Sequence, residues 1–331
     1  MQGQIGNTLP LHILYFYAII NKGYASMGKV MVALSSHRVE ALKFIKEEME
    51  KYHAIILEEA PNPWFKPMLQ SKISIRHYLS KTYPSFPKFS ARLCRILKKF
   101  YSKGKEILQI EPYLYTLEKI YEKIEKEKPS PEELEEDEAL GIVYKKEKEV
   151  FSALLKFYKS SHNFDKAVEA TVNFALKDAS RIKLRDKLRA EEIKKLEYSS
   201  CYVEAGYIHF PLANYLKAKR IFVLEKPTKK LLSAKHALSP SDILTLRLMR
   251  IKKPGEKERL LAARSLIYVA LLSKNEMLPS KSNPFPHLSE EARIIKFVRN
   301  LNYEECRDYF NMLRFVRRED AWKLLEKEGL L

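Results

Sequence analysis

The stretch KVMVALSSHRVEALKFIKEEMEKYHAIILEEAP (29–61) decides the fold. KVMVAL (29–34) is a continuous apolar run of strand length, and HAIILEEAP (53–61) predicts a second strand that Pro61 stops. Between the two runs, apolar residues recur at helical spacing, at Val39, Leu42, Ile45, Met49 and Tyr52. A strand, a helix and a strand in this order form a βαβ unit, so we expect two parallel strands joined by a right-handed crossover.

The same pattern returns later in the chain. SCYVEAG (200–206) predicts a strand, FPLANYLKAK (210–219) a short helix, and RIFVLEKP (220–227) a strand ended by its proline. KEILQIEPY (105–113) is a further strand candidate. We therefore expect an α/β fold whose mostly parallel sheet is built from βαβ units, with a large helical insertion and a helical C-terminal region.

Helical patterns fill most of the remaining sequence. PSPEELEEDEAL (129–140) carries a capping box of Ser130 and Glu133, and long amphipathic patterns follow to about residue 196. Four more helices are predicted, at SPSDILTLRLMR (239–250), EKERLLAARSLIYVALLSK (256–274), SEEARIIKFVRN (289–300) and REDAWKLLEKEG (318–329). The expected regions are an N-terminal edge element or over-extended gene start (1–26), a first half of the core (27–128), a helical insertion (129–198), a second half of the core (199–230) and a helical region (231–331).

Composition bounds the class of protein. With 331 residues, 46% of them apolar, the chain can bury a sizeable core. The net charge of +18 suits an anionic partner, although lysines alternate with glutamates as on an ordinary solvated surface. Abundant Lys and Glu with scarce Gln is typical of thermophilic proteins.

Targeting signals are weak. The three cysteines are widely spaced without a CxxC pair, which fits a reducing compartment and predicts neither a zinc finger nor a redox motif. The apolar runs TLPLHILYFYAII (8–20) and AARSLIYVALL (262–272) are too short to span a bilayer as helices. We expect a cytoplasmic protein without membrane association.

The first candidate for chemistry is ALSSHRVE (33–40), because ligands of α/β proteins bind at the carboxyl ends of strands. His37 lies there with Ser36, and Glu40 is expected to share one helical face with the histidine. The alternative is that Ser35 or Ser36 caps the following helix and His37 is a surface residue.

Carboxylates follow two other strands. Glu58 and Glu59 end the predicted second strand shortly before Pro61, and Glu111 leaves the 105–113 strand just before a proline. A carboxylate on a strand neighbouring that of His37 would face the same crevice. The alternative is a set of solvated acids at strand ends.

EAGYIHF (204–210) adds a second histidine at a strand end. Glu204 ends the strand, Gly206 allows a tight turn, and His209 follows by three residues. Two histidines with several strand-end carboxylates can coordinate a metal or share acid-base work.

RIKLRDKLRAEEI (181–193) places Asp186 on an otherwise apolar helical stripe. A buried carboxylate needs a partner, and Arg185 or Arg189 can supply an ordinary ion pair. In the functional interpretation this helix lines the site, and Arg185 or Arg181 holds an anionic group.

At these residues the sequence resembles the erythromycin-esterase-like superfamily, which includes the TraB/PrgY, TIKI and ChaN-like proteins. The resemblance is carried by three short segments, SSHRVEALKFIKEEMEKYHAIILEEAP (35–61), RDKLRAEEI (185–193) and EAGYIHFPLANYLKAKRIFVLE (204–225). It implies an α/β core with a helical insertion. It also implies a site made of His37, Glu58, Arg185 and His209, with Glu40 and Glu111 nearby.

Members of this superfamily differ in chemistry. TIKI-like members are described as metal-dependent proteases, esterase-like members as hydrolases with a histidine base, and a ChaN-like member as a haem binder. At the first histidine, Leu34 stands where the TIKI-like GxxH motif has glycine, which is a departure from TIKI-type metal binding.

We expect a hydrolase of peptides, esters or another small molecule. His37, Glu58 and His209 would bind one divalent metal (Mn, Co or Zn) or activate water directly, with Glu40 and Arg185 completing the catalytic set. A metal would lower the pKa of its bound water to about 7, and without one a carboxylate-oriented histidine can act as the base.

The alternative is a non-enzymatic basic protein that binds nucleic acid or another anionic partner. ARLCRILKKFYSKGK (91–105) and MRIKKPGEKERLLAAR (249–264) support it. The basic residues otherwise look dispersed, which favours the hydrolase. Self-association into a homo-oligomer stays open, because the aromatic content serves a core or a dimer interface equally well.

Overall fold

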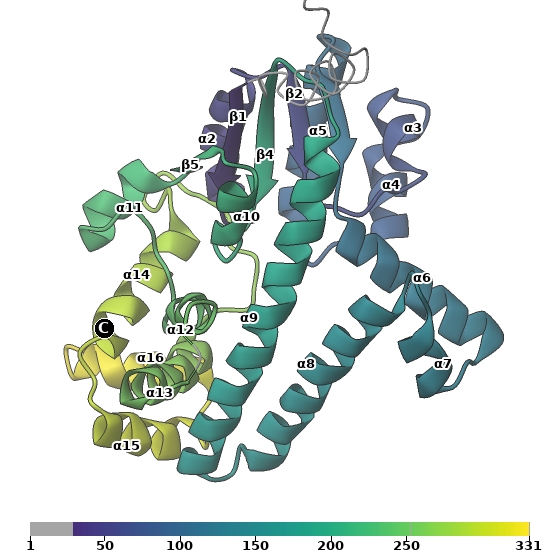
Figure 1. The fold of residues 1–331 in the computed structure, drawn as a ribbon. Helices are drawn as coiled ribbons and strands as arrows, with labels where there is room; N and C mark the ends of the chain where they lie inside the picture. Colours follow the sequence, from purple (N-terminus) through teal and green to yellow (C-terminus); the bar gives the residue numbers. More distant parts are fainter. Residues whose placement is uncertain (1–28, 252, 331) are drawn as a thin grey trace, which may run out of the picture.

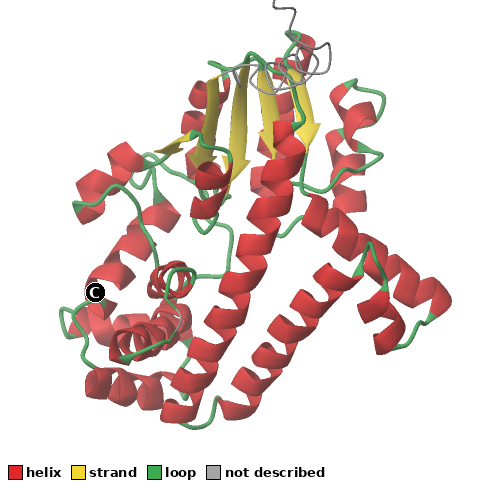
Figure 2. Cartoon of the chain, viewed as in Figure 1, coloured by secondary structure: helices red, strands yellow, loops and turns green. Residues whose placement is uncertain are grey.

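The core is a sheet of five parallel strands in the order β3-β2-β4-β1-β5. The computed structural model describes residues 29–251 and 253–330, so the expected N-terminal element at 1–26 lies outside the described residues. The expected α/β fold is confirmed (Figure 1, Figure 2). The strands are β1 (Lys29–Leu34), β2 (Ala54–Leu57), β3 (Glu106–Gln109), β4 (Ser200–Ala205) and β5 (Lys219–Phe222).

One neighbour relation differs from the prediction. β1 and β2 are parallel, but β4 lies between them and pairs with both. The carboxylate on the strand next to that of His37 is therefore Glu204 of β4. Glu58, which follows β2, lies one strand further away.

Both faces of the sheet are buried, as a parallel sheet requires. Along β1, Met31 and Ala33 join the core on one face, whereas Val32 and Leu34 join the core on the other. β2 is buried along its whole length. This explains why the central strands read as continuous apolar runs rather than as alternating patterns.

The helices between β1 and β3 cover the first face. They are η1 (Val39–Ala41), α2 (Leu42–Met49), α3 (Phe65–Leu69), α4 (Ile75–Thr82) and α5 (Pro87–Ser102). The apolar side of α5 packs into the same core through Phe89, Leu93 and Leu97. Glu276 caps the start of α5 by accepting the backbone N–H groups of residues 88 and 89 at 2.9 and 2.6 Å.

The helical segment between β3 and β4 contains the predicted capping box of Ser130 and Glu133. Its last helix, α9, is 31 residues long and returns to the sheet, where Ala190 and Ile193 pack against the second face (Figure 1). The insertion is therefore continuous with the core. The helices of this part are α6 (Pro112–Glu127), α7 (Pro131–Glu136), α8 (Gly141–Ser160) and α9 (Phe164–Lys194).

α10 completes the second face, α12 to α16 share an apolar core with the first half of α9, and α11 packs against α14. The strand predicted at 220–227 is shorter, because α11 begins at Glu225 and takes Pro227 into its first turn, where a missing N–H costs nothing. No described helix is long and apolar enough to cross a membrane. These helices are α10 (Phe210–Tyr215), α11 (Glu225–Leu232), α12 (Pro240–Leu248), α13 (Glu256–Leu271), α14 (Pro286–Val298), α15 (Tyr303–Leu313) and α16 (Arg318–Lys327).

Candidate functional site

His209 is the centre of a buried polar network at the carboxyl edge of the sheet. Its Nε2 lies 2.8 Å from Glu58 Oε1, and its Nδ1 lies 2.5 Å from Asp186 Oδ1. Burial disfavours a charged ring, but the two carboxylates together raise the pKa of His209 to about 9. At neutral pH the ring is therefore an imidazolium that donates to both acids.

The Glu58 carboxylate accepts three donors from separate parts of the chain. Besides His209, Arg185 Nη2 reaches Glu58 Oε1 at 3.3 Å, and the Gly206 N–H donates to Oε2 at 2.8 Å. Burial alone would raise the pKa of Glu58, yet His209, Arg189 and Arg185 hold it well below its usual range. Glu58 is thus fixed as a carboxylate.

α9 supplies the cations of this network. Arg185 Nη2 also donates to Glu111 Oε2 at 3.2 Å, which brings the carboxylate after β3 into the same group. Arg189 is 1% exposed and donates from Nε to the Ile110 carbonyl at 2.8 Å. The sequence singled out Arg189 only as an ion-pair partner for Asp186. Its position four residues after Arg185, on the same helical face, is the signal that would have placed it here.

His37 stands apart from this network. Its side chain is 38% exposed, its ring stacks on Phe89 at 5.4 Å between centroids, and its Nε2 lies 3.8 Å from Glu204 Oε1, beyond hydrogen-bond distance. Glu204 also accepts the Glu58 N–H at 3.3 Å. Burial, and then the charge of Glu58, raise the pKa of Glu204 despite the opposing influence of His37.

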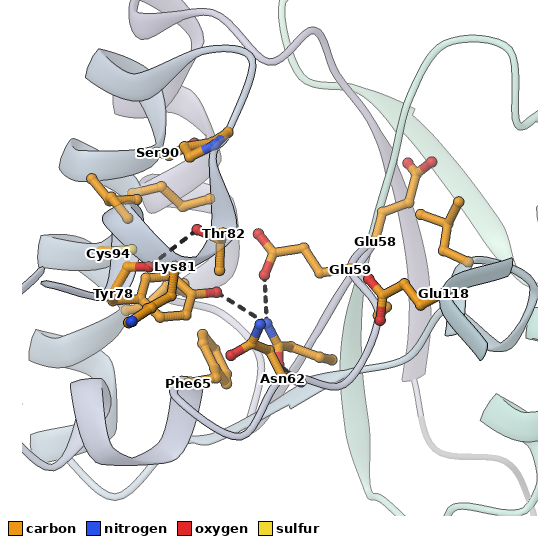
Figure 3. Close-up of a pocket in the computed structure, with 17 residues that line it drawn as sticks. Glu58, Glu59, Asn62, Phe65, Tyr78, Lys81, Thr82, Ser90, Cys94 and Glu118 are labelled. Atoms are coloured by element: carbon orange, nitrogen blue, oxygen red, sulfur yellow. Dashed lines mark hydrogen bonds between the residues drawn. The ribbon is translucent and has the colours of Figure 1, made fainter. Parts of the chain in front are cut away.

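Glu59 opens onto a pocket of about 330 Å³ between α4, α5 and the ends of β2 and β3 (Figure 3). Gln109 Nε2 donates to Glu59 Oε2 at 2.7 Å and also contacts the Tyr78 hydroxyl at 3.3 Å. Burial and the nearby Glu204 raise the pKa of Glu59. Tyr78 and Gln109 were not predicted, because tertiary packing alone brings α4 beside these strand ends.

Two predicted site residues, Glu40 and Arg181, lie elsewhere. Glu40 does not share a face with His37; it is buried and accepts the N–H groups of His287 and Leu288 at 3.0 and 2.8 Å, which caps α14. The physical reason is that Arg38 is extended, so His37 precedes the helical turn and the i,i+3 rule does not apply.

Arg181 turns toward Asp178 and Glu147, at 2.5 and 3.4 Å, rather than into the network. The Ser36 carbonyl accepts the Arg38 N–H, and neither Ser35 nor Ser36 caps the helix, since η1 has no side-chain cap. Gly206 contributes its N–H group, and its φ lies outside the left-handed region that would require glycine.

Comparison with known proteins gives one strong relation. A protein of Archaeoglobus fulgidus, described as uncharacterised, is 34% identical over 279 residues, which cover 84% of this chain and 97% of that protein. The chain belongs to the family of that archaeal protein. No family model matches the chain, and no solved structure matches it. The resemblance to the erythromycin-esterase-like superfamily therefore stays a prediction.

The donor set does not fit the expected metal ion. Both ring nitrogens of His209 are held by carboxylates, and a protonated imidazole has no lone pair for a metal. Within residues 29–251 and 253–330, no three His, Cys, Asp or Glu side chains form a group that could hold a metal. The divalent metal at His37, Glu58 and His209 remains a prediction of the sequence.

Proposed function

We propose that this protein is a hydrolase of esters or peptides in which His37 activates water and Glu59 protonates the leaving group. One observation carries the proposal, a divergence of carboxylate pKa values at a single edge of the sheet. The pKa of Glu58 is held well below its usual range, whereas burial raises the pKa values of Glu59 and Glu204. The raised pKa suits Glu59 to donate a proton, whereas the lowered pKa keeps Glu58 ionised, so that it can hold the groups that position Glu59.

His37 suits the role of base better than His209. It is partly exposed, and no side chain holds its ring nitrogens within hydrogen-bond distance in the described part of the chain. The carboxyl of Glu204 at 3.8 Å can stabilise the imidazolium that forms when His37 takes a proton. General base catalysis of this kind contributes a factor of about 10² to 10⁴.

Glu59 suits the role of acid. It lines the pocket, and its raised pKa favours the protonated form from which a proton can be given. In the reaction, the water oxygen bonds to the carbonyl carbon of the substrate and its proton passes to His37. The bond to the leaving oxygen or nitrogen then breaks as Glu59 donates its proton, and the proton on His37 afterwards restores Glu59.

The buried network around Glu58 helps to position Glu59. Glu58 is adjacent in sequence to Glu59, and its carboxylate is fixed by His209, Arg185 and the Gly206 N–H. Holding Glu58 in place sets the backbone from which Glu59 projects. Glu58 and His209 are therefore positioning residues in this proposal.

The test is turnover of p-nitrophenyl esters and of internally quenched peptides by His37→Ala and Glu59→Gln variants. Each should lose about 10² or more in kcat/KM, with unchanged thermal stability. His162→Ala is the matched control, because this histidine is exposed in the turn between α8 and α9. Wild-type kcat/KM in either variant, or no turnover of any ester or peptide by the native protein, contradicts the proposal.

A further inference from the structure

The positive charge of the chain is concentrated in one segment. Between Glu59 and Glu106 there is no acidic residue, whereas the segment holds eight lysines and three arginines. Eleven of the eighteen net positive charges therefore come from residues 60–105. The interpretation that basic residues are dispersed is wrong for this part of the chain.

The structure arranges these cations along the outer side of α5. The spacing of five of them is four, three, four and four residues, which keeps them on one helical face, and all five are exposed. Within the described residues only Lys103 has an ion pair, with Glu50 at 3.8 Å. We call this set the α5 stripe, and it consists of Lys88, Arg92, Arg95, Lys99 and Lys103.

We propose that the α5 stripe binds the phosphate backbone of a nucleic acid. From Lys88 to Lys103 the helix rises about 22 Å, which is the length of about six steps along one strand of a duplex. A surface that merely keeps a protein soluble mixes both signs of charge. A single-signed row with almost no acidic partner instead matches a row of phosphates.

An anionic membrane is the competing partner, and α5 is poorly suited to it. A helix that lies in a membrane surface inserts an apolar face between the lipids. The apolar face of α5 is already used, because Phe89, Leu93, Leu97 and Phe100 are buried in the core below the sheet. The side of α5 that faces solvent carries charged and small residues, which suits contacts with the phosphate backbone of a nucleic acid.

The stripe is separate from the catalytic proposal. The inner side of α5 contributes Ser90, Leu93 and Cys94 to the pocket beside Glu59, while the cations lie on the opposite side. Binding of nucleic acid therefore does not depend on the hydrolase proposal, and either proposal can fail without the other.

The experiment is fluorescence anisotropy of a labelled duplex DNA and a labelled single-stranded RNA, both of mixed sequence, titrated with the full chain between about 50 and 200 mM salt. We expect log K to fall linearly with log salt, with a slope of about 4 for the duplex if the stripe is fully engaged. The variant Arg92→Gln/Arg95→Gln/Lys99→Gln should bind about tenfold or more weakly, and its slope should drop by about 3.

The matched control is Lys145→Gln/Lys156→Gln/Lys159→Gln on α8. These lysines are exposed, and the substitution removes the same charge. The control should bind like the native chain, and all variants should keep the native melting temperature. The proposal is overturned by an equal loss of affinity in the control, by binding that is indifferent to salt or absent, or by stripe-dependent binding to phosphatidylserine vesicles without binding to either nucleic acid.

Discussion

The loops after β1 and after β4 each carry a histidine, three residues beyond Leu34 and four residues beyond Ala205, yet the two histidines have different surroundings. His209 is buried and held on both ring nitrogens by Glu58 and Asp186. His37 is partly exposed, stacks on Phe89 and has only a distant carboxyl neighbour. Two histidines at strand ends thus have different surroundings, and in the proposed mechanism His209 positions Glu58 whereas His37 acts as the base.

The difference arises from the helices that reach each loop. α9 brings Asp186 to His209, Arg185 to Glu58 and Arg189 to the Ile110 carbonyl. The loop after β1 meets the start of α5 instead, where the ring of Phe89 lies 5.4 Å from the ring of His37 between centroids. The carboxylates beside His209 hold its ring in the protonated form, whereas the aromatic neighbour of His37 leaves the ring nitrogens available.

Replacing the two histidines in turn should separate these roles most sharply. His209→Ala leaves Glu58 and Asp186 buried without their shared partner, so we expect a loss of about 3 to 5 kcal/mol in the free energy of unfolding. His37→Ala removes a half-exposed ring and should cost about 1 kcal/mol or less. Urea unfolding followed by circular dichroism measures both.

The contrast between the two variants is the decisive result. If His37→Ala destabilises the protein as much as His209→Ala, both histidines are structural and the comparison fails. Loss of activity without loss of stability in His37→Ala supports the assignment of roles.

Stability should also depend on pH through His209. Its pKa of about 9 in the folded chain exceeds the ordinary value of 6.5 expected when unfolded. The contribution of His209 to stability is therefore complete below about pH 6.5. It is lost as the pH rises through 9, which lowers the free energy of unfolding by about 3 kcal/mol.

Glu291 also makes stability fall over part of this pH range, because burial raises its pKa to about 8. The quantity to measure is therefore the difference between native protein and His209→Ala from pH 6 to 10. A difference that does not change with pH would contradict a protonated His209.

The fold was largely predictable because short stretches of sequence are enough to indicate its strands and helix starts. KVMVAL and AIIL are apolar runs of strand length, and Ser130 with Glu133 is a cap whose two halves lie three residues apart. The insertion of β4 between β1 and β2 was not predictable, since strand order depends on contacts between distant segments. Even so, α15 was missed although Asn302 and Glu305 form a capping box at its start.

The location of the candidate site could be predicted from the sequence, but most of its side-chain contacts could not. Strand ends drew attention to Glu58, Glu204 and His209, and the structure brings these residues together because parallel strands end at a common edge. Glu40 was misplaced, since local spacing gave no sign that α14 would dock against it. The pairing of Asp186 with His209 required the path of α9 and could not come from either segment alone.

The smallest effect is expected from removing metal. If both nitrogens of His209 are donors to carboxylates, the protein has no preformed imidazole ligand there, so dialysis against a chelator should leave the melting temperature and any ester or peptide turnover unchanged. Elemental analysis beside a His37→Ala/His209→Ala variant should show the same low metal content in both proteins. Near-stoichiometric Mn, Co or Zn that is present in the native chain and lost in the variant would instead establish the metal site that the sequence predicts. In that case His209 would have to exchange Glu58 or Asp186 for the metal, and the two histidines would be partners rather than opposites.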